Sequence, residues 1–581
     1  MDWKRLDKAR GSVGPVELDL IESYAQGKVT RRDFVKRGTV IGLSMPFMVA
    51  IIAACGDDDD GGSSDTQPAA TSGGDTEPAA TTGGDEGGGS GGTVVVAIQQ
   101  GDATSGLDPV NMLDLGTYNV LSQSFEYLVG LGPDGNIAAT ALAESWSPNE
   151  VGDVWTFNLR PGAVWSDGTP VTSADVAATM DRLSAQGNAA LGGVIGEGST
   201  DSSDPAVAEI SLLEANGNFP VLVSLFNAQS LITPVDYTDG TTLDVRPEGS
   251  GAWVLDDWDA TTNVAKFSRN PNWWGGTPPL DGIEMTGFAD ISTAVTAMQS
   301  RDIDVIQQFP VIGGEGLLND AEFVVLSPPS ANHRQVWFNT QQGQFTDPLV
   351  RQALAWTLDR PQMVDTLWAG RAEIGNDHPV LSTLPFYDPN AVEQRVRNID
   401  MAKQLLSDAG VEGISANCDT GDPQEIPQLA AIIQQNAAEA GFDIAVNTQS
   451  NSTFYGAAWC PGASESDATL PCDGSAEFGI VDYGHRPVPD VYFSSALATG
   501  GVWNSSNYTS DEFDTQLSNY RTSIDVDGQK AAVGEIQKIL WNDVPAAYPY
   551  FYNYLSGHDN SVTGVESTAL GHTILSAATK G

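Results

Sequence analysis

The sequence predicts an α/β protein with largely parallel or mixed sheets. A short β-branched apolar run at residues 93–99 (TVVVAIQ) has the length of a buried strand. Residues 347–358 have helical periodicity, with an aspartate cap and a proline in the first turn. A second helix is expected over residues 426–440, closed by a glycine and followed by the strand-like run FDIAV. Strands that alternate with helices in this way are typical of α/β folds.

The composition indicates a large protein and excludes nucleic acid as a partner. A chain of 581 residues that is 41% hydrophobic can bury several cores. It carries 76 acidic and 27 basic residues, for a formal net charge of -49, whereas phosphate binding needs clustered Lys and Arg. The five histidines are scattered, and neither an HExxH nor a CxxC motif is present. We therefore expect no metal site and no other cofactor.

The N-terminal residues have the order of an export signal. The stretch TRRDFVK at residues 30–36 precedes an uncharged run over residues 38–54. The twin arginines resemble those of Tat signals, although an ordinary transmembrane anchor is the alternative. The run ends in IAAC, which resembles a bacterial lipobox. Lipid on Cys55 would anchor the mature protein to the outer face of the cytoplasmic membrane, so residues 1–55 are expected to be signal peptide and lipobox.

Two further expectations concern a tether and a disulfide. Residues 56–92 are rich in Gly, Ser, Thr and Asp and almost free of apolar side chains, which predicts a disordered acidic tether. In an exported protein a pair of cysteines is expected to be oxidised. Cys460 and Cys472 bracket a loop of turn-forming residues and are the favoured pair, while Cys418 is expected to be buried.

A series of motifs along the chain suggests a family. Leu107-Asp108-Pro109 is followed by LAESW at residues 142–146, TFNLR at 156–160 and WSDGTP at 165–170. Later come NPNWWGG at residues 270–276 and VWFNT at 336–340. In this order the motifs resemble the family 5 extracellular solute-binding proteins of ABC importers, the peptide- and nickel-type binding proteins. The resemblance covers nearly all of residues 93–560.

The resemblance implies a type II periplasmic-binding-protein fold, in which two α/β lobes are joined by a hinge and accompanied by an extra domain. On this basis we expect lobe I at residues 93–130, 218–308 and 541–581, the extra domain at 131–217, and lobe II at 309–540. Chain crossings near Phe309-Pro310 and in residues 541–545 are the hinge candidates.

The resemblance also implies a function. We expect a monomeric receptor, not an enzyme, that captures a peptide-like or other polar organic solute and delivers it to an ABC transporter permease. Two alternatives remain open. A ligand-sensing lipoprotein that signals to a membrane partner would have the same fold. A secreted hydrolase is the other, although no GxSxG elbow or metal motif supports it.

The stretch VDYGHRPVPDVY at residues 481–492 is the main site candidate. In peptide-binding relatives the corresponding segment carries an aspartate that pairs with the free amino group of the ligand. His485 stands at that position here, next to Arg486, and neither side chain can replace a carboxylate. Either the two residues meet an anionic or hydroxyl-rich ligand, or Arg486 is structural and pairs with Asp482 or Asp490.

The resemblance suggests further ligand contacts on loops and helix ends that border the cleft. These candidates are Tyr118, Phe125, Glu126, Tyr483 and Trp503. The alternatives are core packing for Phe125 and a solvated helix face for Glu126. Trp503 offers a stacking face, although most of the 14 Trp residues must be core.

Overall fold

The computed structural model describes residues 91–581, apart from residues 102–105, 113, 133–134, 189, 239, 462–471 and 473. The expected export signal, Cys55 and nearly all of the expected tether lie outside the described residues. Within the described part, no helix has both the length and the apolar character needed to cross a membrane.

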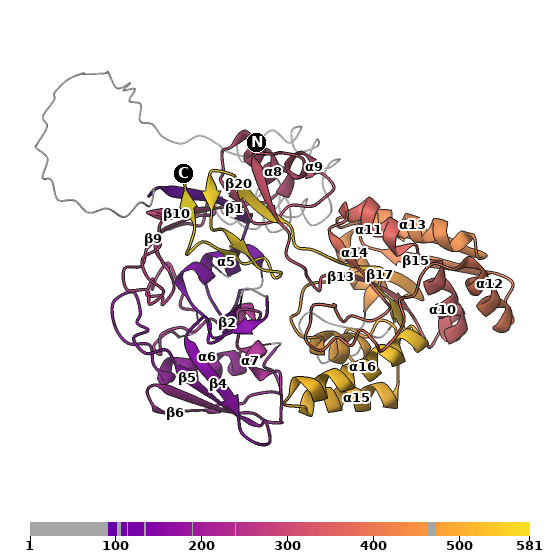
Figure 1. The fold of residues 1–581 in the computed structure, drawn as a ribbon, viewed down its shortest axis with the longest axis horizontal. Coiled ribbons are helices and arrows are strands. Elements are labelled where there is room, and N and C mark those ends of the chain that lie inside the picture. The colour runs from indigo at the N-terminus through magenta and orange to yellow at the C-terminus, as the bar shows by residue number, and fades with distance from the viewer. Residues whose placement is uncertain are drawn as a thin grey trace, which may run out of the picture. The chain divides into compact units, whose positions relative to one another are not determined.

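The first large sheet defines lobe I and confirms the predicted strand at residues 93–99. It has seven strands in the order β12-β20-β11-β1-β10-β9-β8 (Figure 1). Their bounds are β1 Thr93–Gln99, β8 Trp253–Asp259, β9 Val264–Arg269, β10 Gly282–Phe288, β11 Val305–Ile306, β12 Phe323–Leu326 and β20 Ser556–Asp559. Strand β1 runs parallel to β10 and β11, and the other pairs are antiparallel, so the sheet is mixed as expected.

Short elements complete this part of the chain. The helices are α5 Leu115–Ser124, α7 Phe219–Leu222, η1 Ala228–Ser230, α8 Ile291–Ser300 and α9 Glu315–Leu318. Three two-stranded pairs join β2 Gly130–Leu131 to β3 Ile137–Ala138, β21 Val562–Thr563 to β24 Thr579–Lys580, and β22 Glu566–Ser567 to β23 Thr573–Ile574.

A separate four-stranded sheet lies within the range expected for the extra domain. Its order is β4-β5-β7-β6, with bounds β4 Ala143–Pro148, β5 Val154–Leu159, β6 Thr200–Asp204 and β7 Val207–Ser211. Strand β5 alternates between half-buried and buried residues, as its sequence predicts. Helix α6 (Ser173–Ala185) starts with the expected capping interaction, because the carboxylate of Asp175 accepts a hydrogen bond from the Thr172 N–H at 2.8 Å.

The second large sheet defines lobe II. Its strands run in the order β14-β19-β13-β17-β15-β16, and β18 pairs with β13. The bounds are β13 His333–Phe338, β14 Ala372–Ile374, β15 Ile414–Thr420, β16 Phe442–Thr448, β17 Phe478–Tyr483, β18 Ala546–Ala547 and β19 Tyr550–Tyr552. Strand β15 is parallel to β16 and β17, so this sheet is mixed too.

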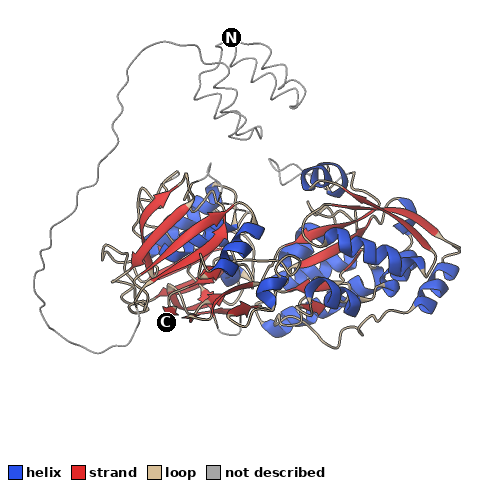
Figure 2. Cartoon of the chain, turned by 90° about the horizontal axis from the view of Figure 1, so that it is seen from above, coloured by secondary structure: helices blue, strands red, loops and turns tan. Residues whose placement is uncertain are grey.

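Both predicted helices lie in lobe II. Helix α10 (Pro348–Thr357) is capped by the Asp347 carboxylate, and α13 (Ile426–Ala438) leads into β16. The remaining helices are η2 Gly343–Thr346, α11 Arg360–Trp368, α12 Ile399–Asp408, α14 Asn451–Phe454, η3 Tyr455–Trp459, η4 Tyr492–Leu497, α15 Asp511–Thr522 and α16 Val526–Asp543. Figure 2 shows helices alongside the strands of the large sheets.

Alternation along β17 assigns its residues to two different cores. Phe478 and Ile480 pack with residues of α10, α11 and α13. Val481 and Tyr483 pack with residues of η4, α15 and α16. Successive side chains of a strand point to opposite faces, so Asp482 lies on the α10–α13 face of the sheet.

The sheets correct the expected boundaries of the lobes. Strand β12 returns to the lobe I sheet and pairs with β20, so the chain crosses between lobes at residues 327–332 and not near Phe309-Pro310. Strands β18 and β19 belong to the lobe II sheet, so the second crossing lies at residues 553–555 and not at 541–545. Strands of two to four residues give little periodicity, which is why the sequence misplaced both crossings.

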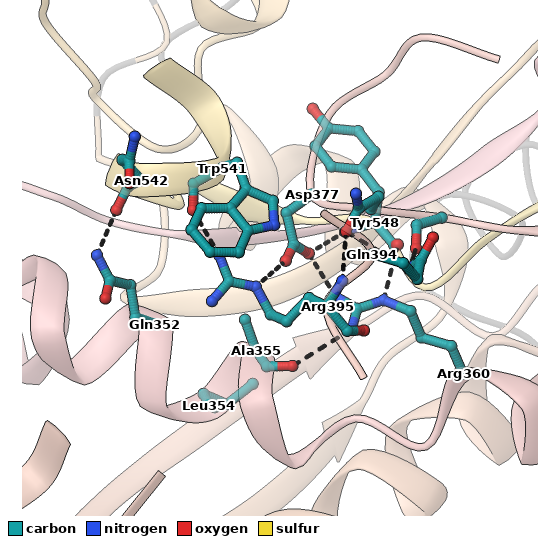
Figure 3. Close-up of polar contacts among 12 residues, drawn as sticks. Gln352, Leu354, Ala355, Arg360, Asp377, Gln394, Arg395, Trp541, Asn542 and Tyr548 are labelled. Carbon is teal, nitrogen blue, oxygen red and sulfur yellow. Dashed lines mark hydrogen bonds and ion pairs between the residues drawn. The ribbon is translucent and has the colours of Figure 1, made fainter. Parts of the chain in front are cut away.

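A buried ion cluster joins helices and loops of lobe II. Figure 3 shows Asp377 between two guanidinium groups. Its carboxylate accepts hydrogen bonds from Arg360 Nη2 at 2.6 Å and Arg395 Nε at 2.7 Å, and also from the Tyr548 N–H. All three charged side chains are almost completely buried, and Arg395 lies 4.1 Å from the centre of the Trp541 ring. The cluster fixes a loop, two helices and the start of β19 relative to one another.

The cysteine predictions are confirmed. Cys460 and Cys472 form a disulfide, and Cys418 is a free, buried thiol. Burial raises the pKa of Cys418 far above its ordinary value, so this thiol stays protonated and unreactive.

Candidate ligand-binding site

The loop after β17 is tied to one of the two crossings between the lobes. The Ala331 N–H donates a hydrogen bond to His485 Nδ1 at 3.0 Å, and the His485 N–H donates to Asn332 Oδ1 at 2.6 Å. The ring of Phe226, which follows α7, lies 5.5 Å from the His485 ring. A ligand that touches this loop is thereby coupled to the hinge.

His485 is neutral in this environment. It is only 6% exposed, and burial, assisted by the neighbouring Arg486, lowers the pKa of its ring to about 3. Because Nδ1 accepts a hydrogen bond, the proton of the neutral ring is on Nε2. The ring therefore carries one N–H donor, at Nε2, and no charge.

Arg486 follows His485 in the same loop and is half-buried. Its Nη1 donates to the His485 carbonyl at 2.8 Å, but no carboxylate among the described residues pairs with it. The two pairings named for the structural alternative are not seen among the described residues, because Asp482 is bonded to Arg334 and Asp490 is bonded to Arg521. A half-buried guanidinium without a carboxylate partner is suited to an anionic group of a ligand.

Two of the predicted aromatic residues lie beside this loop. The hydroxyl of Tyr483 donates to the Trp503 carbonyl at 3.4 Å, and their rings are 6.3 Å apart. Tyr483 also stacks on His333, with 5.4 Å between ring centres. The structure thus brings together Tyr483, His485 and Trp503, with Arg486 next in the chain.

The other three predicted contacts lie elsewhere. Tyr118 and Phe125 are buried in the hydrophobic core of lobe I. The Tyr118 hydroxyl donates a hydrogen bond to the Leu225 carbonyl, and Phe125 packs edge-on against Tyr237. Glu126 is not on a solvated helix face. Its carboxylate accepts hydrogen bonds from the indoles of Trp273 and Trp274 at 2.8–3.1 Å. Burial outweighs these bonds and raises its pKa to about 7.

A cavity of about 250 Å³ lies between the two lobes. Its aromatic and apolar walls come from both lobes and from the second crossing, with a few amide and carboxylate groups among them, which is the usual character of a small-molecule site. The lining residues are Ile291, Gln308, Phe309, Pro310, Val311, Ile312, Leu367, Trp368, Gln424, Glu425, Tyr552, Asn553, Tyr554 and Leu555.

A buried arginine connects the cavity wall to β17. Arg334 on β13 donates to both carboxylate oxygens of Glu425 and to Gln424 Oε1 at 2.7–2.9 Å. It also donates to Asp482 and to the Tyr552 hydroxyl. Burial alone would lower the pKa of Arg334, but the carboxylates of Asp482 and Glu425 raise it well above its ordinary value. The guanidinium is permanently charged and holds the cavity wall and the strand together.

Strand β17 has an open edge next to this cluster. It pairs with β13 along its whole length, but with β15 only at Gly479 and Ile480. Strand β15 ends at Thr420, and the chain turns away toward Gln424, whose φ of 51° lies in the left-handed region. No described strand pairs with residues 481–483 on that side, so an extended segment of a ligand has unpaired strand positions there to which it can be added.

The family of the chain is shown by a family model. Residues 138–470 match the model for bacterial extracellular solute-binding proteins, family 5, middle part. The chain belongs to this family. It is therefore a two-lobed, extracytoplasmic solute-binding protein of the ABC transporter type, which delivers its solute to a permease.

Relatives and solved structures agree with this assignment. The glutathione-binding protein GsiB of Escherichia coli strain K12 is 25% identical over 479 residues, which span 81% of this chain and 91% of the relative. HbpA2 from Haemophilus parasuis superposes with a TM-score of 0.71 at 20% identity, over 84% of this chain and all of the other. The DppA protein of Helicobacter pylori in complex with the peptide STSA gives a TM-score of 0.63 at 21% identity, over 84% and 98% of the two chains.

Most residues of the cavity wall carry no sequence signal that distinguishes them as ligand contacts. Trp368 ends a helix and Tyr552 ends a short strand, and nothing local distinguishes them from core aromatics. Gln424 did carry a signal, because the run GDPQE combines turn chemistry with a helix start. Phe226 is recognised as a neighbour of the loop only in the folded structure, where its ring contacts the ring of His485.

Proposed function

We propose that the protein binds a short peptide or another polar organic solute with a carboxylate group between the two lobes and releases it chemically unchanged. The observation that carries this proposal is Arg486, a half-buried guanidinium without a carboxylate partner in the described part of a chain with a net charge of -49. In such an acidic protein a guanidinium without a carboxylate partner is suited to an anionic group of a ligand.

Two observations support a peptide-like ligand. The open edge of β17 presents main-chain groups that can pair with an extended ligand backbone. The names of similar proteins also refer to peptide-like solutes, namely glutathione for GsiB and the peptide STSA for DppA of Helicobacter pylori.

Neutral His485 argues against a ligand amino group at the loop. Peptide-binding relatives, by the resemblance stated above, place a carboxylate at this position. His485 and Arg486 together present hydrogen-bond donors and one positive charge, which repel an ammonium group.

Tethering and assembly complete the proposal. Lipid on Cys55 would hold the protein at the outer face of the cytoplasmic membrane. Residues 56–92 would act as a linker that allows the folded body to extend away from the membrane surface. We infer that the protein acts as a monomer with the permease, and that it performs no covalent chemistry.

A thermal-shift screen tests the proposal. Free ligand at 100 times its Kd stabilises a protein by about 2.7 kcal/mol, so a ligand raises the unfolding temperature measurably. We expect carboxylate-bearing short peptides to stabilise the protein and to be recovered intact by mass spectrometry. Arg486→Gln should weaken the affinity of these ligands by about tenfold or more. Stabilisation only by uncharged or cationic solutes, or cleavage of the bound peptide, would contradict the proposal.

A further inference from the structure

We infer that residues 214–226 form a latch, which fastens the four-stranded sheet and lobe I to lobe II and couples this docking to ligand binding at the loop after β17. The chain crosses between the lobes at residues 327–332 and 553–555, so the contacts of the latch with lobe II lie outside the hinge. The latch does not depend on the identity of the ligand. Its coupling to the ligand rests on the proposed function, because it assumes that residues 485–486 contact the solute.

The latch is held firmly on its own side. It leads from β7 through α7 toward lobe I. The Asn216 N–H donates a hydrogen bond to the Gly152 carbonyl at 3.0 Å, and the Trp155 indole donates to the Asn216 carbonyl at 3.2 Å. Phe219 is completely buried in the core that lobe I shares with the four-stranded sheet. The latch therefore moves with the four-stranded sheet and lobe I.

The middle of the latch lies against the turn between α15 and α16 of lobe II. The Gly217 N–H donates a hydrogen bond to the Arg521 carbonyl at 3.2 Å. Asn218 Oδ1 accepts a hydrogen bond from Gln529 Nε2 at 3.0 Å, and both of these side chains are almost completely buried. Val221 packs against the core of η4, α15 and α16. Polar and apolar contacts thus join the latch to lobe II.

The glycine at position 217 is required by the closeness of this contact. Its φ lies outside the left-handed region, so alanine can adopt the same backbone conformation. A Cβ on Gly217 would overlap the carbonyl oxygen of Ser523 and lie 2.9 Å from Gln529 Nε2. The three atoms nearest to this Cβ all belong to lobe II. Gly217→Ala therefore obstructs docking and leaves the latch free to fold on its own side.

The contact is small enough to open. The buried apolar residues on its two sides belong to different hydrophobic cores. Among the described residues, two hydrogen bonds cross it, and the loss of one such bond shifts an equilibrium by about fivefold. Interfaces of this kind between parts of one chain permit relative motion.

The latch reaches the ligand loop at two points. The ring of Phe226, at the end of the latch, lies 5.5 Å from the ring of His485. Arg521, whose carbonyl accepts a hydrogen bond from the latch, donates to both carboxylate oxygens of Asp490 at 2.6 and 3.0 Å. Asp490 belongs to the same loop as His485. A ligand that orders this loop favours docking, and docking favours the ligand by the same factor.

Hydrogen exchange of the unliganded full chain, measured by mass spectrometry, tests the latch. Gly217→Ala and Gln529→Ala should each speed the exchange of backbone amides in residues 214–226 and 521–529 by about fivefold or more, because the docked state is less populated. Exchange in the four-stranded sheet should stay unchanged.

Two matched controls make the same chemical changes away from the contact. Gly196→Ala places a Cβ 3.9 Å from Leu213, which is an ordinary van der Waals distance. Gln516→Ala changes a glutamine of α15 that accepts a hydrogen bond from Asn519 in the same helix. Neither control should alter the exchange of the latch.

Three outcomes would overturn the latch. The first is unchanged exchange of residues 214–226 in both Gly217→Ala and Gln529→Ala. The second is faster exchange that extends through the four-stranded sheet, because the contact would then be part of the fold and not a reversible docking. The third is an equal effect of the control substitutions.

Calorimetric titration with trialanine tests the coupling. Gly217→Ala should bind trialanine about fivefold more weakly than wild type, and Gly196→Ala should bind it equally well, because the binding-competent docked state is less populated only in the first variant. Equal affinity of Gly217→Ala and wild type would overturn the coupling. If wild-type protein does not bind trialanine, the peptide of the proposed function is wrong and the coupling falls with it, while hydrogen exchange still decides the latch.

Discussion

Replacement of Asp377 by Asn should strongly destabilise lobe II. The Asp377 carboxylate is completely buried and is the only carboxylate that forms an ion pair with Arg360 and Arg395 among the described residues (Figure 3). Asn has nearly the same shape and tolerates the positive φ of 62° at this position, so the substitution removes the charge and little else. Two buried guanidinium groups would then lack a counter-ion.

The expected cost follows from burial. Breaking a buried ion pair by neutralising one partner typically costs about 3–5 kcal/mol, because the remaining charge stays desolvated. For a lobe of about 220 residues, each kcal/mol lowers the unfolding temperature by about 2–4 °C, so Asp377→Asn should lower it by about 6–20 °C. The cation–π contact between Arg395 and Trp541 does not replace the lost carboxylate.

Thermal unfolding by circular dichroism measures the effect. Asp490→Asn is the matched control, because it makes the same chemical change in a pair whose arginine, Arg521, is 41% exposed. Partly exposed pairs contribute about 1 kcal/mol or less. Equal effects of the two substitutions, or a change below about 1 kcal/mol for Asp377→Asn, would refute the reasoning from burial.

Two further predictions concern pH. The pKa of Glu126 is raised from 4.5 to about 7 by burial, so the folded state binds more protons than the unfolded state and stability falls as pH rises between these values. Glu126→Gln removes this dependence. The free energy of unfolding of the variant, measured by urea denaturation and taken relative to wild type, should therefore increase by about 1–3 kcal/mol between about pH 5 and pH 8. A difference between the two proteins that does not change with pH would rule out the raised pKa. The pKa of His485 is about 3, so its ring stays neutral between about pH 5 and pH 7. The affinity for a peptide with a free carboxylate, measured by calorimetry, should change less than about twofold over this range. A change in affinity with a midpoint near pH 6.5 would mean that a charged imidazole contacts the ligand.

Local sequence signals predicted the regular elements well. Strand β1, the cap of α10 and the succession from α13 to β16 were all predicted from patterns that extend over seven residues or more. The lobe boundaries were not, because they depend on strands β11, β12, β18 and β19, each of two to four residues. Long-range pairing decides which of the two sheets such a short strand joins. This pairing produces no periodic pattern of apolar residues in the sequence.

The candidate site shows the same division. A departure from a family pattern indicated His485 and Arg486, and the structure places them at the hinge with Tyr483 and Trp503 close by. The prediction for Glu126 was incomplete, since its two indole partners come from residues almost 150 positions away. Arg334 was not recognised, because a single arginine in a strand gives no sign that it binds two carboxylates from other segments.

Hydrogen exchange measured by mass spectrometry tests the central claim most directly. A peptide that stabilises the protein in the thermal-shift screen should slow exchange of backbone amides in residues 481–486, on the open edge of β17, and at the crossing of residues 553–555. The four-stranded sheet of the extra domain should serve as an internal reference with unchanged exchange. Slowed exchange confined to that sheet, or unchanged exchange along residues 481–486, would show that the ligand binds elsewhere.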